Sequence, residues 1–125
     1  MFCNQCEQTA QGTGCTIKGV CGKDPDIQSL QETLLFALKG IGAYSYHARV
    51  MGEREEEIDA FMHEAMFKTL TNVDFDLNDM VRMVLKAGKI NLKAMEMLDR
   101  ANTKHYGMPV PVKVPTGTIK GPRIL

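Results

Sequence analysis

The sequence predicts an all-α fold, in which a cysteine-rich N-terminal loop lies on a bundle of three or four helices. Three observations support this prediction. Apolar residues recur every three or four positions between residues 24 and 107, which is typical of helices with one buried face. The first 23 residues hold all four cysteines and show neither helical nor strand periodicity. Residues 108–125 begin with a proline-rich stretch that favours extended backbone.

The size and charge of the chain indicate the class of protein. With 125 residues, it is expected to form one structural domain. Its hydrophobic content of 44% is typical of a folded protein. The 15 basic residues balance the 15 acidic ones, which argues against a dedicated nucleic-acid-binding domain. No apolar run approaches the roughly 20 residues that cross a bilayer, so we expect no membrane partner.

The start of the sequence bears on the cellular compartment. A secretory signal begins with basic residues and continues with an apolar run of roughly 7–15 residues, and the opening residues MFCNQC have neither. We therefore expect a cytoplasmic protein. Because disulfides are uncommon in that reducing compartment, we expect the four cysteines to bind metal or to carry redox chemistry.

Three segments are expected along the chain. Residues 1–23 form a loop, and a loop this long needs something to hold it in a small domain. Residues 24–107 form the helical bundle. Residues 108–125 form an extended linker that ends on an apolar pair, as if a strand began there. We therefore expect the chain to be a piece of a longer one.

The first helix is expected to begin at residues 24–26, where Asp suits the cap and Pro suits the first turn. It is expected to end at Gly52. Gly40 and Gly42 weaken its middle, and we interpret them as sites of close helix packing. Its apolar stripe contains Ile27, Leu30, Leu34, Leu38, Ile41 and Tyr44.

The rest of the bundle is expected to contain two or three further helices. One covers residues 53–72, and we interpret the glutamates that crowd its first turn as a solvated helix start. Asp76 and Asp79 are expected to cap the next, which Gly88 is expected to break. A last helix then continues to an end within residues 102–107.

The cysteines carry the predicted chemistry. Their spacing is C-x2-C-x8-C-x5-C, with the second and third separated by a glycine-containing loop whose backbone N–H groups can approach sulfur. Four thiolates can hold a [4Fe–4S] cluster or one Zn²⁺. Structural zinc sites more often show two short pairs, so the spacing favours iron–sulfur over zinc, and both over disulfides or independent thiols. The four positions are Cys3, Cys6, Cys15 and Cys21.

Other polar residues have simpler interpretations. Lys18 and Lys23 could offset the charge of a cluster, but we interpret them as ordinary solvated lysines. His47 and His63 are expected on helix surfaces rather than as metal ligands, and His105 is expected to complement a helix dipole. We find no set of residues that could act as a catalytic site, so none is predicted in this chain.

Several segments match one known family. They are the cysteine block of residues 1–23, Leu38-Lys39-Gly40, Lys86-Ala87-Gly88, Ala101-Asn102-Thr103 and Tyr106-Gly107. Through them the whole chain resembles the N-terminal part of the hybrid-cluster proteins, also called prismane proteins or hydroxylamine reductases. The cysteine block is the most specific part of the match. The helical segment has room for one bundle, so the chain resembles the shorter class, which lacks one of two bundles.

The resemblance implies a function and a cofactor. It implies that Cys3, Cys6, Cys15 and Cys21 coordinate a [4Fe–4S] cluster. The family reduces hydroxylamine to ammonia and water and is tied to nitric oxide detoxification under nitrosative stress. That reaction takes place at a hybrid iron–sulfur–oxygen cluster in later α/β domains, whose ligands are not in this chain.

We therefore expect an electron-transfer domain that is inactive by itself. An external donor protein would supply its electrons, and the absent C-terminal α/β catalytic domains would receive them. The alternative is a helical interaction domain that zinc or a cluster clamps, without a redox role.

Overall fold

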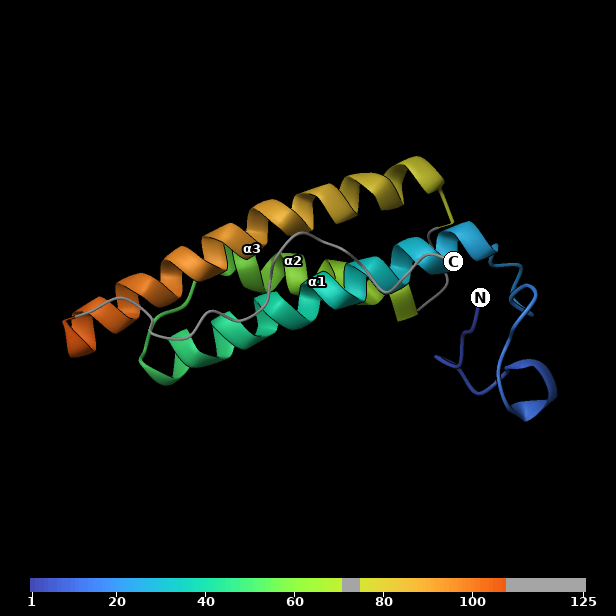
Figure 1. The fold of residues 1–125 in the computed structure, drawn as a ribbon, viewed down its shortest axis with the longest axis horizontal. Coiled ribbons are helices and arrows are strands. Elements are labelled where there is room, and N and C mark those ends of the chain that lie inside the picture. Colours follow the sequence, from blue (N-terminus) through green and yellow to red (C-terminus); the bar gives the residue numbers. More distant parts are fainter. Residues whose placement is uncertain (71–74, 108–125) are drawn as a thin grey trace.

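The computed structural model describes residues 1–70 and 75–107. These ranges contain a 3-10 turn, η1 (Ala10–Gly12), and the helices α1 (Pro25–Val50), α2 (Glu56–Leu70) and α3 (Leu77–Tyr106). They contain no strand, which confirms the predicted all-α class. Helices α1 and α3 run in the same direction and α2 runs back in the opposite one (Figure 1). The cysteine loop therefore lies at the end of the bundle where α1 and α3 begin.

The boundaries of α1 agree with the prediction. Pro25 opens its first turn, and Asp24 stands at the N-cap in an extended conformation, although its side chain makes no capping hydrogen bond. Gly52 follows the helix with a φ of 86°, a left-handed conformation that glycine adopts without strain. Our interpretation of Gly42 as a close-packing site is wrong, because an added Cβ would meet Met62 Cε at an ordinary contact distance of 3.7 Å.

Helix α2 begins three residues later than predicted, and its glutamates are not simply solvated. The carboxylate of Glu53 lies 3.5 Å from the ammonium of Lys104, and Glu57 lies 2.6 Å from Lys93. Glu55 pairs with Arg100 in the same row. These exposed pairs join residues 53–57 to α3, and solvent screening keeps the contribution of each to stability small.

Helix α3 is one continuous helix of 30 residues, so the predicted break at Gly88 is wrong. Asp76 caps it as expected, since its carboxylate accepts from the N–H groups of Asn78 and Asp79 at 2.9 and 3.2 Å. A glycine inside a helix costs only about 1 kcal/mol relative to alanine. The apolar residues on both sides of Gly88 are buried against the bundle, which more than offsets that cost.

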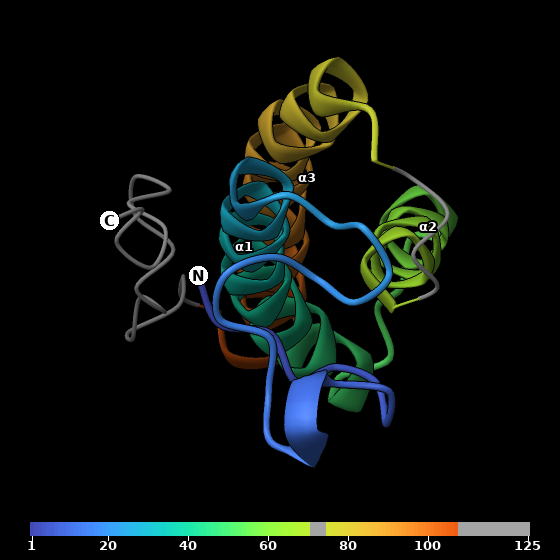
Figure 2. The ribbon, with the colours of Figure 1, turned by 90° about the vertical axis from the view of Figure 1, so that its right-hand side faces the viewer.

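The core lies chiefly between α1 and α3, which make the most extensive helix contact of the bundle. Helix α2 covers one side of this pair (Figure 2). The largest fully buried apolar side chains are Leu34, Ile41, Tyr44, Ile58, Met80, Ile90 and Met97. Within the described residues, the connected hydrophobic cluster of the bundle includes no residue of 1–23, although Cys15 is buried in the loop itself. The bundle therefore has a hydrophobic core that does not depend on the cysteine loop.

The predicted extended linker at residues 108–125 lies outside the described residues. The same holds for the end of the second predicted helix, beyond Leu70. Within the part of the chain that the structure describes, no helix combines the length and the apolar character that crossing a membrane requires.

Candidate metal centre

The cysteine loop folds back on itself so that two of the cysteines lie side by side. The N–H of Cys3 donates to the carbonyl of Cys15, and the N–H of Cys15 donates to the carbonyl of Cys3, both at 2.9 Å. This pair is an isolated antiparallel bridge, and η1 reverses the chain between its two members. In Figure 2 the loop faces the viewer across the end of the bundle.

A second turn brings Cys21 to the same place. The N–H of Gly19 donates to the carbonyl of Lys23, and the N–H of Gly22 donates to the carbonyl of Gly19, both at 2.8 Å. A Cβ on Gly19 would lie 2.9 Å from Lys23 Cβ and 3.1 Å from Cys21 Sγ. These distances are too short for an unchanged turn, so the close approach requires glycine at position 19.

All four predicted ligands line one small cavity of about 40 Å³. Cys15 is buried, Cys3 is half-buried, and Cys6 and Cys21 are exposed. The cavity therefore has an inner side and an open side. Leu70, the last residue of α2, also lines it, so the bundle contributes directly to its wall. None of the four cysteines forms a disulfide.

The four sulfurs share this cavity but are not yet arranged as a coordination sphere. Across residues 1–70 and 75–107, no group of three or more His, Cys, Asp or Glu side chains is close enough to hold a metal ion. The structure thus brings the predicted ligands to one place without setting the distances between their sulfurs.

Backbone hydrogen bonds from Ala10 and Val20 favour the thiolate form of Cys15 over the neutral thiol. The N–H of Ala10 donates to Cys15 Sγ at an N···S distance of 3.4 Å. Hydrogen bonds from the backbone of Ala10 and of Val20 lower the pKa of the Cys15 thiol, and the charge of Lys23 lowers it further against the opposing effect of burial. Metals bind the thiolate form, so these contacts favour a ligand role for Cys15.

Lys23 is the principal site residue that our sequence analysis misjudged. It is 1% exposed, not solvated. Its ammonium donates to Cys3 Sγ at 3.7 Å and to the side-chain oxygens of Gln5 and Gln28, both at 3.3 Å. An ammonium has three N–H donors, and these three acceptors match them in number. Lys18 is exposed as expected and lies 3.6 Å from Asp24.

Gln28 fixes the orientation of this contact. Its Nε2 donates to the carbonyl of Phe2 and to the carboxylate of Glu32, both at 3.1 Å, which leaves its Oε1 to face Lys23. The first turns of α1 thereby hold both the start of the cysteine loop and its lysine. In the sequence, a glutamine among the apolar residues at the start of this helix indicates a buried polar contact but does not identify its partner.

The site fits a group that is held by four thiolates. A buried cation is costly unless an anion lies near it, and no carboxylate lies within ion-pair distance of Lys23 in the described ranges. Of its three acceptors, only the sulfur of Cys3 can carry negative charge. Deprotonated, metal-bound cysteines would supply that charge, whereas four neutral thiols would not.

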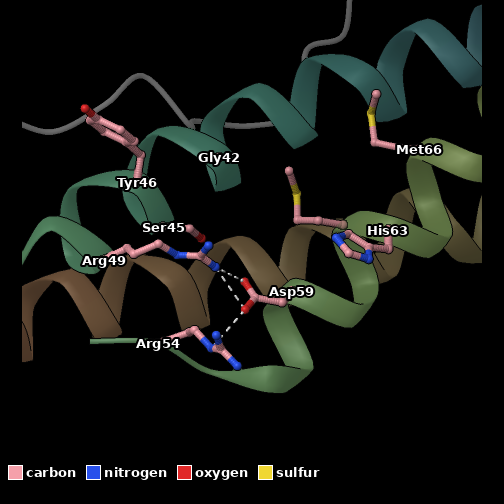
Figure 3. Close-up of a pocket in the computed structure, with 9 residues that line it drawn as sticks. Gly42, Ser45, Tyr46, Arg49, Arg54, Asp59, His63 and Met66 are labelled. Carbon is pink, nitrogen blue, oxygen red and sulfur yellow. Dashed lines mark hydrogen bonds and ion pairs between the residues drawn. The ribbon is translucent and has the colours of Figure 1, made fainter. Parts of the chain in front are cut away.

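A larger, open cavity of about 650 Å³ lies between α1 and α2 (Figure 3). Arg49 and Arg54 converge there on the carboxylate of Asp59, at 3.0 and 3.5 Å. This carboxylate is therefore engaged in two ion pairs that join α2 to α1 and to the segment between the two helices. His63 lies on the rim of the cavity and is exposed, as is His47, which agrees with the surface positions expected for both.

Comparisons with known proteins find relatives that are named hydroxylamine reductase. It is 62% identical to a hydroxylamine reductase from Moorella thermoacetica and 55% identical to one from Thermotoga maritima, over all 125 residues in both cases. The chain spans 29% of each of these relatives. It is also 47% identical, over 116 residues, to a hydroxylamine reductase from Syntrophobacter fumaroxidans, of which it spans 21%.

These shares show that the relatives come in two lengths. A similar stretch of sequence is a larger share of the Moorella and Thermotoga proteins than of the Syntrophobacter protein, so the first two are shorter. The resemblance to a shorter class agrees with this difference. In every case most of the relative lies outside the part that the chain matches.

The family comparison covers the complete sequence. The family described as Prismane/CO dehydrogenase matches residues 1–84 and, in a second overlapping match, residues 42–125. Both the cysteine loop and the helical bundle fall within these matches. The chain therefore belongs to the Prismane/CO dehydrogenase family.

Proposed function

We propose that this chain is the N-terminal electron-transfer domain of a hydroxylamine reductase, in which Cys3, Cys6, Cys15 and Cys21 coordinate one [4Fe–4S] cluster. The observation that carries the proposal is the single cavity that all four cysteines line. The names of the relatives supply the enzyme. The cysteine spacing and the resemblance to hybrid-cluster proteins favour iron–sulfur over zinc.

The proposed cluster would accept and release one electron at a time. The residues of this chain would set the conditions for that exchange. Cys15 and Cys3 would hold the buried side of the cluster, where backbone N–H groups and Lys23 face sulfur. The exposed Cys6 and Cys21 would hold the open side, where an external donor protein could approach.

In the whole enzyme, hydroxylamine would take up two electrons and two protons to give ammonia and water. The α/β catalytic domains beyond this chain would carry out that step at the hybrid cluster, and this domain would deliver the electrons. We place the protein in the cytoplasm, with a role in nitrosative stress and nitric oxide detoxification. No residue of this chain is assigned to catalysis.

Anaerobic absorption spectroscopy tests the proposal. The purified chain should show a broad visible absorption that bleaches with dithionite, and Cys15→Ser should lose it because one of four ligands is gone. His47→Ser is the matched control, since this exposed side chain takes no part in the site and the absorption should stay. A colourless parent chain that holds one zinc would favour the interaction domain without redox function instead.

A further inference from the structure

Lys23 has surroundings that an ordinary surface lysine does not have. It is 1% exposed, and its ammonium faces the sulfur of Cys3 inside the wall of the cysteine cavity. Gln5 and Gln28 accept its other hydrogen bonds without adding charge. A positive charge is therefore enclosed beside one predicted ligand, and within residues 1–70 and 75–107 the sulfur of that ligand is the one hydrogen-bond partner of Lys23 that can become an anion.

We propose that Lys23 is a built-in counter-charge that raises the reduction potential of the metal centre and orients Cys3. This inference rests on the proposed function, because it assumes a cluster on the four cysteines. Lys23 touches a ligand rather than the substrate, so its role is that of a positioning residue. The inference goes beyond the proposed ligand set, because it assigns control of the reduction potential to one side chain.

The physical reason is the charge that reduction adds. The potential of an iron–sulfur cluster depends on its net charge, on hydrogen bonds to its sulfurs and on solvent exposure. One added electron makes the centre more negative, and a nearby enclosed cation stabilises that state. Because Lys23 is shielded from solvent, water and salt screen its charge far less than they screen a surface lysine.

The surroundings keep this lysine in place. The amide of Gln28 is oriented by Phe2 and Glu32, so that its oxygen faces the ammonium. The backbone of Lys23 is held by the hydrogen bond from Gly19, at 2.8 Å. Both ends of the side chain are therefore fixed before any metal binds, which is what a preset counter-charge requires.

Lys18 provides a matched control. It lies in the same loop and carries the same charge, but its side chain is 59% exposed and pairs with Asp24. Lys18→Met and Lys23→Met change the net charge of the chain equally. Only the second removes a charge that is enclosed beside a cysteine sulfur.

A redox titration of the reconstituted 125-residue chain, followed by EPR, tests the inference. In Lys23→Met, reduction should become about tenfold less favourable, which corresponds to about 59 mV for one electron. In Lys18→Met, the change should stay below twofold. An unchanged potential in Lys23→Met, with the cluster intact, would overturn the inference and leave the proposed function standing.

Lys23→Arg covers the case in which Lys23→Met takes up no cluster. If the arginine variant holds the cluster at the parent potential, a positive charge at this position is required and the inference is supported. If neither variant holds a cluster, the position serves packing and the inference fails. If the parent chain itself takes up no iron, the proposed function fails, and the inference fails with it.

Discussion

Cys15 is the most buried of the four cysteines, and its surroundings lower the pKa of its thiol in the metal-free chain. Its sulfur accepts a hydrogen bond from Ala10, and its backbone pairs with that of Cys3. The loop that carries the site is thus ordered by main-chain hydrogen bonds. Such bonds depend on the path of the backbone, which is why the spacing of the cysteines predicts the ligand set but not which of the four is buried.

The lowered pKa of Cys15 predicts a pH dependence of folding in the metal-free chain. The folded pKa lies below the ordinary value of 9.0, so the folded state releases this proton more readily than the unfolded state. The resulting stabilisation is fully present above the unfolded pKa and is lost as the pH falls through the folded pKa. The difference in unfolding free energy between the parent and Cys15→Ser should therefore grow between pH 7 and pH 9.

Denaturant titrations of both proteins at several pH values measure this difference, and Cys6→Ser is the control because Cys6 is exposed. A difference that does not change with pH would show that Cys15 titrates alike in the folded and unfolded chains.

Gly19 leads to a second prediction at the residue scale. In Gly19→Ala, the new Cβ would displace Lys23 and Cys21 from the turn that holds them. The variant should bind less iron than the parent, while its helical content stays the same because the loop adds nothing to the core. Iron analysis together with far-UV circular dichroism checks both parts, and unchanged iron binding would show that the turn tolerates a side chain.

Lys23 marks the limit of prediction at this scale. A lysine after a cysteine-glycine pair is usually solvated, and its burial depends on Gln28, which a different element contributes. The contact joins residues five positions apart across the junction of loop and helix. It follows from how the loop packs on α1, and no local pattern in the sequence states that packing.

At the scale of elements, helix positions follow local rules where caps and turns decide them. The start of α1, the cap of α3 at Asp76 and the left-handed Gly52 all lie where the sequence places them. Gly88 lies where tertiary packing overrides local preference, because burial of the long apolar face of α3 outweighs one glycine. The glutamates of residues 53–57 pair with α3, a helix distant in sequence, and helix periodicity alone does not reveal such pairs.

Two glycines of this part of the chain should respond in opposite ways to the same substitution. Gly52→Ala should destabilise the chain by about 1 kcal/mol, because its φ of 86° is unfavourable for alanine. Gly42→Ala should stabilise it by up to about 1 kcal/mol, since alanine is the better helix former and a Cβ has room beside Met62. Thermal or chemical unfolding of both variants measures the pair, and destabilisation by Gly42→Ala would mean that α1 and α2 pack more tightly than described.

At the scale of the whole molecule, different interactions stabilise the helical core and the cysteine loop. The core is formed by α1, α2 and α3, and the loop is tied to it through a few polar contacts such as those of Gln28. The all-α class could be predicted from the sequence, and so could the N-terminal loop that carries all four cysteines. The arrangement of the sulfurs could not, because in the proposed site it would depend on the metal as well as on the chain.

This separation predicts how the protein responds to loss of metal. Removal of the metal with a chelator should leave the far-UV helical signal nearly unchanged, because no core residue comes from the loop. Protection of the backbone N–H groups in residues 1–23 should fall, which hydrogen exchange measures. A cooperative loss of helix on chelation would show that the metal centre is needed for the bundle to fold.

The central claim is that the four cysteines hold one [4Fe–4S] cluster. Its most direct test is analysis of iron and acid-labile sulfide, with Mössbauer spectroscopy, after anaerobic purification and reconstitution of the chain. We expect four irons and four sulfides per chain in one cubane cluster. Two irons per chain, a single zinc, or iron content that Cys15→Ser leaves unchanged would contradict it.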